Sequence, residues 1–270
     1  MTRHITAELL VLRKRAATWI LLGIWTLLGT FFAYVVPYAL DPEDAPAGLV
    51  QFLPESLAGT LISGFPFFGG VFALMLGVFA LGSEYGWDTL KTLFTQRPGR
   101  LRVFAAKLAA LGIVLIPFVL ALFAAGAVAS SVIARIEDAP VSWPSAWLLV
   151  RAFAAGWLIL AVWAALGVLL GVLTRGTSLA IGVGILYALV IEGLLSNLSA
   201  LEPVTEVFLR ANGYSIAAAL GASVESIGSS GPGSFGGPFV GGGQALAVLV
   251  AFIAGFSALS AFLLRRRDVA

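Results

Sequence analysis

The sequence predicts an all-α, polytopic membrane protein, and three observations lead to this fold class. Of the 270 residues, 60% are hydrophobic and only 11% are charged, whereas soluble domains carry about 25% charged residues. Six apolar segments are each long enough to cross a hydrocarbon core of about 30 Å as a helix. Within these segments the apolar residues are continuous and do not alternate with polar ones, which favours helices over strands. We therefore expect residues 1–270 to form a single transmembrane domain.

An amphipathic segment precedes the first of these helices. Residues 3–15 combine aliphatic side chains such as Leu9 and Leu10 with basic ones such as Arg13 and Lys14. This pattern is typical of a short helix that lies in the membrane interface with its apolar side towards the lipid. The alternative is a positively charged flank that only sets the topology.

The six predicted spans follow in order along the chain. They cover about residues 18–38, 65–82, 103–133, 147–173, 178–198 and 244–264. Because only the short turn 174–177 separates the fourth span from the fifth, these two should form an antiparallel hairpin. Lysine and arginine gather in the N-terminal segment, in the loop after the second span, at Arg175 and at residues 265–267. By the positive-inside rule, both termini and these loops are expected in the cytoplasm.

The segment 199–243, between the last two spans on the outer side, has two interpretations. Glycine and proline are dense in residues 228–243, and this composition disfavours regular structure. One interpretation is a mobile outer loop. The other is a short re-entrant or lid-like element over an outer exit, with residues 204–220 as its helical part. Re-entrant backbone is tolerated only where it is buried in protein or faces water.

The sequence lacks the residues and motifs of several kinds of catalytic site. It has no cysteine and a single histidine, His4, which excludes thiolate and histidine-rich metal sites. It also lacks the H-E-x-x-H, G-x-S-x-G and phosphate-loop G-x-x-x-x-G-K-[ST] motifs. We therefore expect no catalytic residue, metal site or cofactor in this chain, and any ATP that drives it must be hydrolysed by another subunit.

One carboxylate, Glu192, falls inside a predicted span. A charged side chain at the centre of a membrane helix costs about 2.5–3.5 kcal/mol on insertion scales, so such residues usually face the interior of the bundle. One interpretation is structural, with Glu192 hydrogen-bonded to a neighbouring helix. The other is functional, with Glu192 on a substrate path or linked to proton transfer.

The segment 84–102 is a polar stretch between the second and third spans, and it is the best candidate for contact with a soluble partner. A short helix is expected within it, because Asp88 and Thr89 are suitable N-cap residues. Pro98 and Gly99 then end this helix.

The expected helix has one apolar face. Leu90, Leu93 and Phe94 recur at a spacing of i, i+3 and i+4, which suits the groove of a partner or the bundle itself. The basic residues Arg97 and Arg100 follow, and they can bind anionic lipid or acidic residues of a partner. The alternative is a basic topology signal without a partner.

The same segment resembles the first cytoplasmic loop of type-two ABC transporter permeases, the membrane subunits of bacterial ABC exporters. The matching residues are Glu84, Gly86, Trp87, Thr89, Leu90, Leu93, Arg97, Pro98, Arg100 and Lys107. One departure is the order Gly-Trp-Asp-Thr at 86–89, where that family usually has Trp-Gly-Thr or Gly-Thr. The layout is also similar, with an N-terminal interfacial helix, six spans and a long outer segment before the last span.

The resemblance implies a function, a location and partners. The chain would be a permease subunit of an ATP-binding cassette exporter in the inner membrane of a bacterium. It would pair with a second permease, as a homodimer or a homologous heterodimer, and two ATP-binding cassette ATPase subunits would dock on residues 85–98. Substrate would leave between the first, second and fifth spans. The docking residues would be Trp87, Asp88, Thr89, Leu90, Leu93, Phe94, Arg97 and Arg100.

Membrane lipid is also expected as a partner, and nucleic acid is not. Two other classes of function stay open. A secondary transporter that works alone would need ionisable residues within its spans for ion coupling, and Glu192 is nearly the only one. A membrane-anchored signalling or assembly protein would transport nothing. A neighbouring gene for an ATPase with Walker motifs would favour the ABC permease over both.

Overall fold

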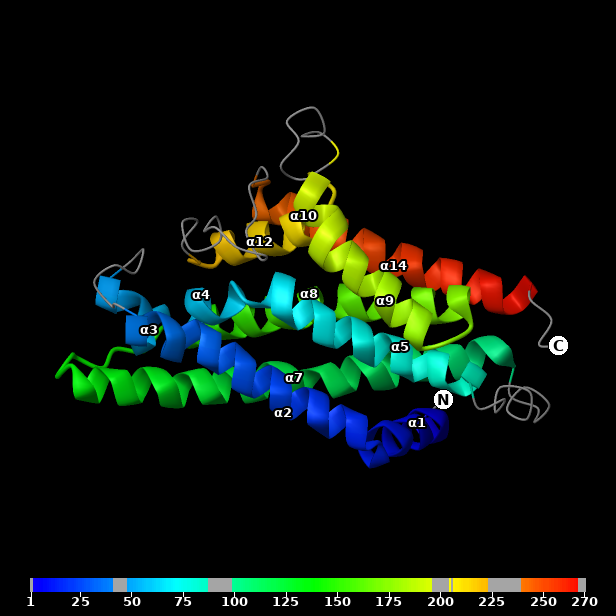
Figure 1. Ribbon diagram of the computed structural model, residues 1–270, viewed down its shortest axis with the longest axis horizontal. Coiled ribbons are helices and arrows are strands. Elements are labelled where there is room, and N and C mark those ends of the chain that lie inside the picture. Colours follow the sequence, from blue (N-terminus) through cyan, green and yellow to red (C-terminus); the bar gives the residue numbers. More distant parts are fainter. Residues whose placement is uncertain are drawn as a thin grey trace.

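In the computed structural model the chain folds as a bundle of long helices (Figure 1). The structure describes residues 2–40, 48–86, 99–195, 204, 206–222 and 239–266. These residues contain no strand, and five of the helices are long and apolar enough to cross a membrane. The protein is therefore an all-α polytopic membrane protein, as the sequence predicts.

Five candidate spans agree with five of the six predicted ones. They are Ala16–Leu40, Phe65–Gly82, Leu101–Ile136, Ala146–Thr174 and Gly242–Arg266. The helices that hold the last four are α5 (Gly70–Gly86, with the turn before it), α7 (Arg100–Ile136), α8 (Ala146–Thr174) and α14 (Gly242–Arg266). The 37 residues of α7 reach about 55 Å, at about 1.5 Å per residue. This helix is therefore longer than a hydrocarbon core requires.

The predicted span 178–198 begins as a continuous helical run that follows α8. Its parts are α9 (Ser178–Leu186), the π-helical turn η5 (Tyr187–Ile191) and α10 (Glu192–Leu195). Between α8 and α9, Arg175 has a φ of 54°, the left-handed conformation that commonly ends a helix. The chain reverses there, and α9 packs against α8 as the predicted hairpin. The run is not among the five candidate spans, so a sixth span stays a prediction.

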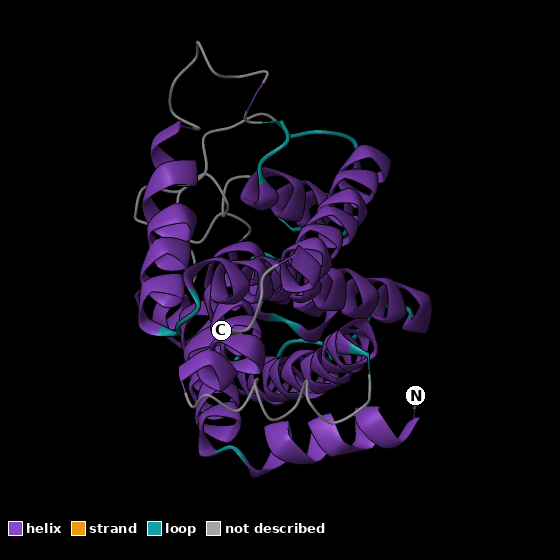
Figure 2. Cartoon of the chain, turned by 90° about the vertical axis from the view of Figure 1, so that its right-hand side faces the viewer, coloured by secondary structure: helices purple, strands orange, loops and turns teal. Residues whose placement is uncertain are grey.

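The N-terminal segment forms its own helix, α1 (Thr2–Lys14), which is separate from the first span. Arg15 has an extended backbone and breaks the helix. The span then continues through α2 (Ala16–Thr30), the π-helical turn η1 (Phe31–Val35) and α3 (Val36–Leu40). Figure 2, which looks along the long axis, shows α1 lying across the end of the bundle. This direction fits a helix in the membrane interface.

The centre of the bundle is the contact between α5 and α8, whose backbones touch at two glycines. A Cβ atom added to Gly77 would lie 2.0 Å from the carbonyl oxygen of Ala164, and one added to Gly167 would lie 2.1 Å from that of Leu74. Small residues allow such close approach in membrane bundles. Most residues of these two spans are buried, whereas few residues of the first span and of α14 are.

Shorter elements fill the end of the bundle opposite to α1. The chain between the first two spans contains two 3-10 turns, η2 (Gly48–Phe52) and η3 (Pro54–Ser56), and then α4 (Leu57–Ile62). The second span then begins with the π-helical turn η4 (Phe65–Gly69). The segment before α14 contributes α12 (Leu209–Ala219), which packs against α14, α8 and η4. Residues 209–217 are all buried, so this part of the predicted outer segment is a packed helix. Residues 223–238 lie outside the described residues.

Candidate functional site

The predicted docking segment lies between the ends of two described helices. α5 ends at Gly86, and α7 begins at Arg100 directly after its N-cap residue, Gly99. Arg100 is therefore the first residue of α7. Outside the described residues lie the other predicted docking residues: Trp87, Asp88, Thr89, Leu90, Leu93, Phe94 and Arg97. The structure thus describes the base of this segment, where α5 and α7 meet α1.

An ion pair connects α1 to α7 at this base. Lys107 Nζ lies 2.7 Å from Glu8 Oε2, and the two side chains are 4% and 15% exposed. Because the pair is nearly shut off from water, its electrostatic attraction is stronger than that of a surface pair. Lys107 lies two turns into α7, so α1 is tied to α7 close to the start of that helix, which follows the docking segment in the sequence.

A second contact connects α1 to α5. Arg15, at the break after α1, donates from Nη1 to the carbonyl oxygen of Phe79 at 2.6 Å. Phe79 lies two turns before the end of α5. The two contacts therefore hold both helices that flank the docking segment, one on each side of it.

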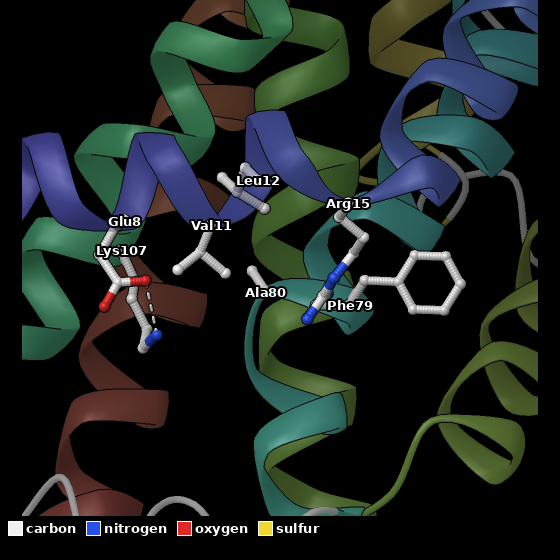
Figure 3. Close-up of a pocket in the computed structure, with 7 residues that line it drawn as sticks. All are labelled: Glu8, Val11, Leu12, Arg15, Phe79, Ala80 and Lys107. Carbon is white, nitrogen blue, oxygen red and sulfur yellow. Dashed lines mark hydrogen bonds and ion pairs between the residues drawn. The ribbon is translucent and has the colours of Figure 1, made fainter.

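Figure 3 shows the Glu8–Lys107 pair on one side of a small patch of apolar side chains and Arg15 on the other side. Val11 and Leu12 of α1 and Ala80 of α5 lie between the Glu8–Lys107 pair and Arg15. The space among them is about 10 Å³, at the lower limit of what one water molecule needs. We call this arrangement the α1 joint. It is packed and has no room for a substrate, so what it can provide is a mechanical connection.

Glu192 is buried, and its carboxylate binds the start of α12. Oε1 accepts a hydrogen bond from the backbone N–H of Leu209, and Oε2 accepts one from that of Arg210, both at 2.9 Å. The hydroxyl of Tyr187 donates to the same carboxylate. The first backbone N–H groups of a helix lack partners within the helix and carry partial positive charge. Glu192 therefore caps α12 from another helix, which supports its structural interpretation.

The side chain of Arg210 lies beside this cap and is fully buried. Its Nη1 donates to the carbonyl oxygen of Ala188 at 3.2 Å, and its guanidinium lies 5.2 Å from the ring centre of Phe67. The positive guanidinium also attracts the carboxylate of Glu192. Sequence reasoning missed the burial of this arginine. The signal that could have found it is the intramembrane carboxylate itself, which needs a partner.

Three π-helical turns lie in the helices predicted as the first, second and fifth spans. They are η1, η4 and η5. The ring of Phe32 in η1 stacks on that of Phe68 in η4, with ring centres 5.5 Å apart. Arg210 bridges from the ring of Phe67 in η4 to the carbonyl oxygen of Ala188 in η5. π-Helical turns are rare in proteins as a whole, but those that occur often lie at functional sites.

The described residues offer no chemical centre beside these packed sites. Among them, no cluster of three or more histidine, cysteine, aspartate or glutamate side chains could hold a metal ion. The carboxylates of Glu8 and Glu192 are both engaged by other helices. The arrangement can thus join helices and pass movement between them.

The fold and these sites define a polytopic helical membrane protein whose N-terminal helix is fastened to α5 and α7 beside the ends that flank the docking segment. The sequence matches the family model of the ABC-2 family transporter protein over residues 4–191, well over half of the chain. The protein belongs to this family and is a type-2 ABC transporter permease. The match includes the docking segment and the α1 joint, and it ends one residue before Glu192. A search of the curated proteins found no match.

Proposed function

We propose that the protein moves a substrate outward across the membrane, using ATP that a separate ATP-binding cassette subunit hydrolyses. The observation that carries the proposal is the α1 joint, which binds both helices that flank the docking segment. The chain itself has no phosphate-binding loop. In a family of transport subunits, the energy must then enter through a contact with another protein.

The proposed topology has six spans with both termini in the cytoplasm of a bacterial cell. The sixth span is the run from α9 to α10. In its support, α1, the start of α7, the turn between α8 and α9 and the end of α14 lie at the same end of the bundle (Figure 1). This is also the end where lysine and arginine gather, as the positive-inside rule requires of a cytoplasmic face.

The ATPase docks on residues 85–98, through the apolar face of Leu90, Leu93 and Phe94 and the basic residues that follow. A push on this segment acts on the ends of α5 and α7 at once. Because Lys107 is paired with Glu8 and Arg15 is bonded to α5, α1 moves with both helices. Packed helices move as rigid bodies more easily than they deform, so the α1 joint would turn a local push into a movement of this whole end.

The substrate path runs between the first, second and fifth spans, and a second permease, identical or homologous, completes it. The three π-helical turns lie on these spans, around Arg210 and the aromatic residues Phe32, Phe67 and Phe68. A π-helical turn is a local irregularity that neighbouring packing has to maintain. The three turns are therefore the points where these helices would change shape when an exit opens.

Co-purification with an ATP-binding cassette ATPase encoded beside this chain tests the proposal. The permease is expected to retain that ATPase through detergent extraction. The double variant Leu90→Asp/Leu93→Asp should lose it, because two carboxylates then occupy the apolar docking face. The control is Val141→Asp, a change of an exposed apolar residue at the opposite end of the bundle. If the double variant still folds and keeps the ATPase, the docking face is assigned wrongly.

A secondary transporter that works alone receives less support from the structure. A secondary transporter requires an ionisable group that can exchange its ion with water, and the carboxylate of Glu192 accepts hydrogen bonds from Leu209, Arg210 and Tyr187 instead. Transport by the purified chain alone, driven by an ion gradient and without ATP, would favour that rival.

A further inference from the structure

A groove opens on the side of α1 that faces away from the α1 joint. It has a volume of about 370 Å³ and lies between α1, α2 and α7, within the range of about 300–1,000 Å³ that is usual for small-molecule sites. Its walls are mostly apolar. The apolar lining residues are Leu9, Leu10, Trp19, Leu22, Ile113, Val114, Pro117 and Phe118.

The position of the groove determines what can reach it. Two of its walls, α2 and α7, belong to candidate spans, and Leu10, Trp19 and Ile113 are each about half exposed. Apolar surface that is exposed on a membrane span faces lipid chains. The third wall is α1, which lies across the end of the bundle (Figure 2). The groove therefore runs from the interface into the hydrocarbon.

The groove also has a few polar lining residues, and one of them is positively charged. Arg13 and the hydroxyl-bearing Thr6 and Thr18 line it. The indole N–H of Trp19 donates to the carbonyl oxygen of Arg13 at 2.7 Å, which fixes the backbone at this corner. The side chain of Arg13 is exposed, and no carboxylate of the described residues forms an ion pair with it. An exposed cation that lines a mostly apolar groove is complementary to an anionic amphiphile.

We propose that this groove binds one anionic glycerophospholipid, with its phosphate on Arg13 and an acyl chain between α2 and α7. The guanidinium can donate two parallel hydrogen bonds to a phosphate. Leu22, Val114 and Phe118 take the place of neighbouring lipid chains around the bound one. This lipid fills the corner between α1 and the first span. The inference depends on the groove alone, and it stands whether or not the docking segment binds an ATPase.

The test uses the full-length protein, stripped of lipid in an uncharged detergent and titrated with phosphatidylglycerol under native mass spectrometry. One lipid is expected to bind much more tightly than any further one. Arg13→Gln should weaken this binding about tenfold, because a charge-assisted contact is lost. Lys14→Gln is the matched control, since it removes the same charge from an exposed neighbour that does not line the groove. It should change the affinity less than twofold, because Lys14 does not line the groove. In an uncharged micelle there is also no negative surface that would attract Lys14.

A second variant tests the place of the acyl chain. Val114→Trp fills the groove and should abolish the tight binding, with Ile113→Trp as its substitute if the first variant fails to fold. Phosphatidylcholine with the same chains should bind more weakly than phosphatidylglycerol, because its choline opposes Arg13. Equal losses in Arg13→Gln and Lys14→Gln would overturn the proposal, as would unchanged binding in a folded groove-filled variant.

Discussion

At the scale of single residues, the pairing of Glu8 with Lys107 is the contact on which the α1 joint depends most. Both side chains are largely removed from water, and a buried pair offsets its own desolvation only while both members are present. Removing one member leaves the other charge without its partner in an apolar corner. The pair therefore makes the position of α1 specific without adding much net stability.

Replacing Lys107 by Met should destabilise the protein by about 3 kcal/mol, because the carboxylate of Glu8 loses its partner. Thermal unfolding in detergent measures this change. The double variant Glu8→Gln/Lys107→Met should recover part of the lost stability, since no unpaired charge is left. Lys14→Met, on an exposed part of α1, is the control. If Lys107→Met and Lys14→Met unfold at the same temperature, the pair does not hold α1.

Glu192 is the second buried carboxylate whose role can be tested. It can serve either the structure or transport. In Glu192→Gln the side-chain carbonyl oxygen still accepts a hydrogen bond from the start of α12, but the charge opposite Arg210 is lost. We expect destabilisation of about 3 kcal/mol, partly reversed in the double variant Glu192→Gln/Arg210→Met. ATPase activity per folded complex should stay near that of the unchanged protein. Full thermal stability combined with lost activity would instead show a role in the substrate path.

At the scale of elements, the contact between α5 and α8 fixes how the bundle packs. The backbones approach each other at Gly77 and Gly167 with no space for a methyl group. Apolar side chains give little net drive for association in lipid, so close backbone packing has to supply it. A side chain at either position must push the two central helices apart.

Gly77→Ala should therefore destabilise the bundle by about 3 kcal/mol, at the upper end of the effects of overpacking. Gly167→Ala should behave in the same way. Gly255→Ala in α14 is the matched control, because a Cβ atom added there meets nothing within 4 Å. Unfolding temperatures and the yield of monodisperse protein measure the effect. Equal behaviour of Gly77→Ala and Gly255→Ala would contradict the observed packing.

The elements also show how far the sequence alone could predict this structure. The length and apolarity of a span are local properties, and five predicted spans agree with helices of the structure. The pair of Glu8 and Lys107 joins residues 99 positions apart, and nothing in either local pattern points to the other. The burial of Arg210 and the π-helical turns depend on tertiary packing in the same way. Glu192 could be recognised because a carboxylate in an apolar run is a local exception.

At the scale of the whole molecule, the two packed sites lie at different levels of one bundle. The α1 joint fastens the end that carries the docking segment, and the Glu192 cap fastens α12 to the predicted fifth span. The central contact of α5 and α8 runs between these levels (Figure 1). In a subunit built in this way, a movement of α5 and α7 at the docking segment can be transmitted along the membrane normal to the level of the Glu192 cap.

The central claim is that an ATPase docks on the segment between α5 and α7. Because the chain has no cysteine, Leu93→Cys introduces a unique thiol, which can be cross-linked in native membranes to the co-expressed ATP-binding cassette ATPase. The account predicts a cross-linked product from Leu93→Cys and none from Val141→Cys at the opposite end of the bundle. A product from Val141→Cys, or none from Leu93→Cys in a membrane that contains both proteins, would contradict it.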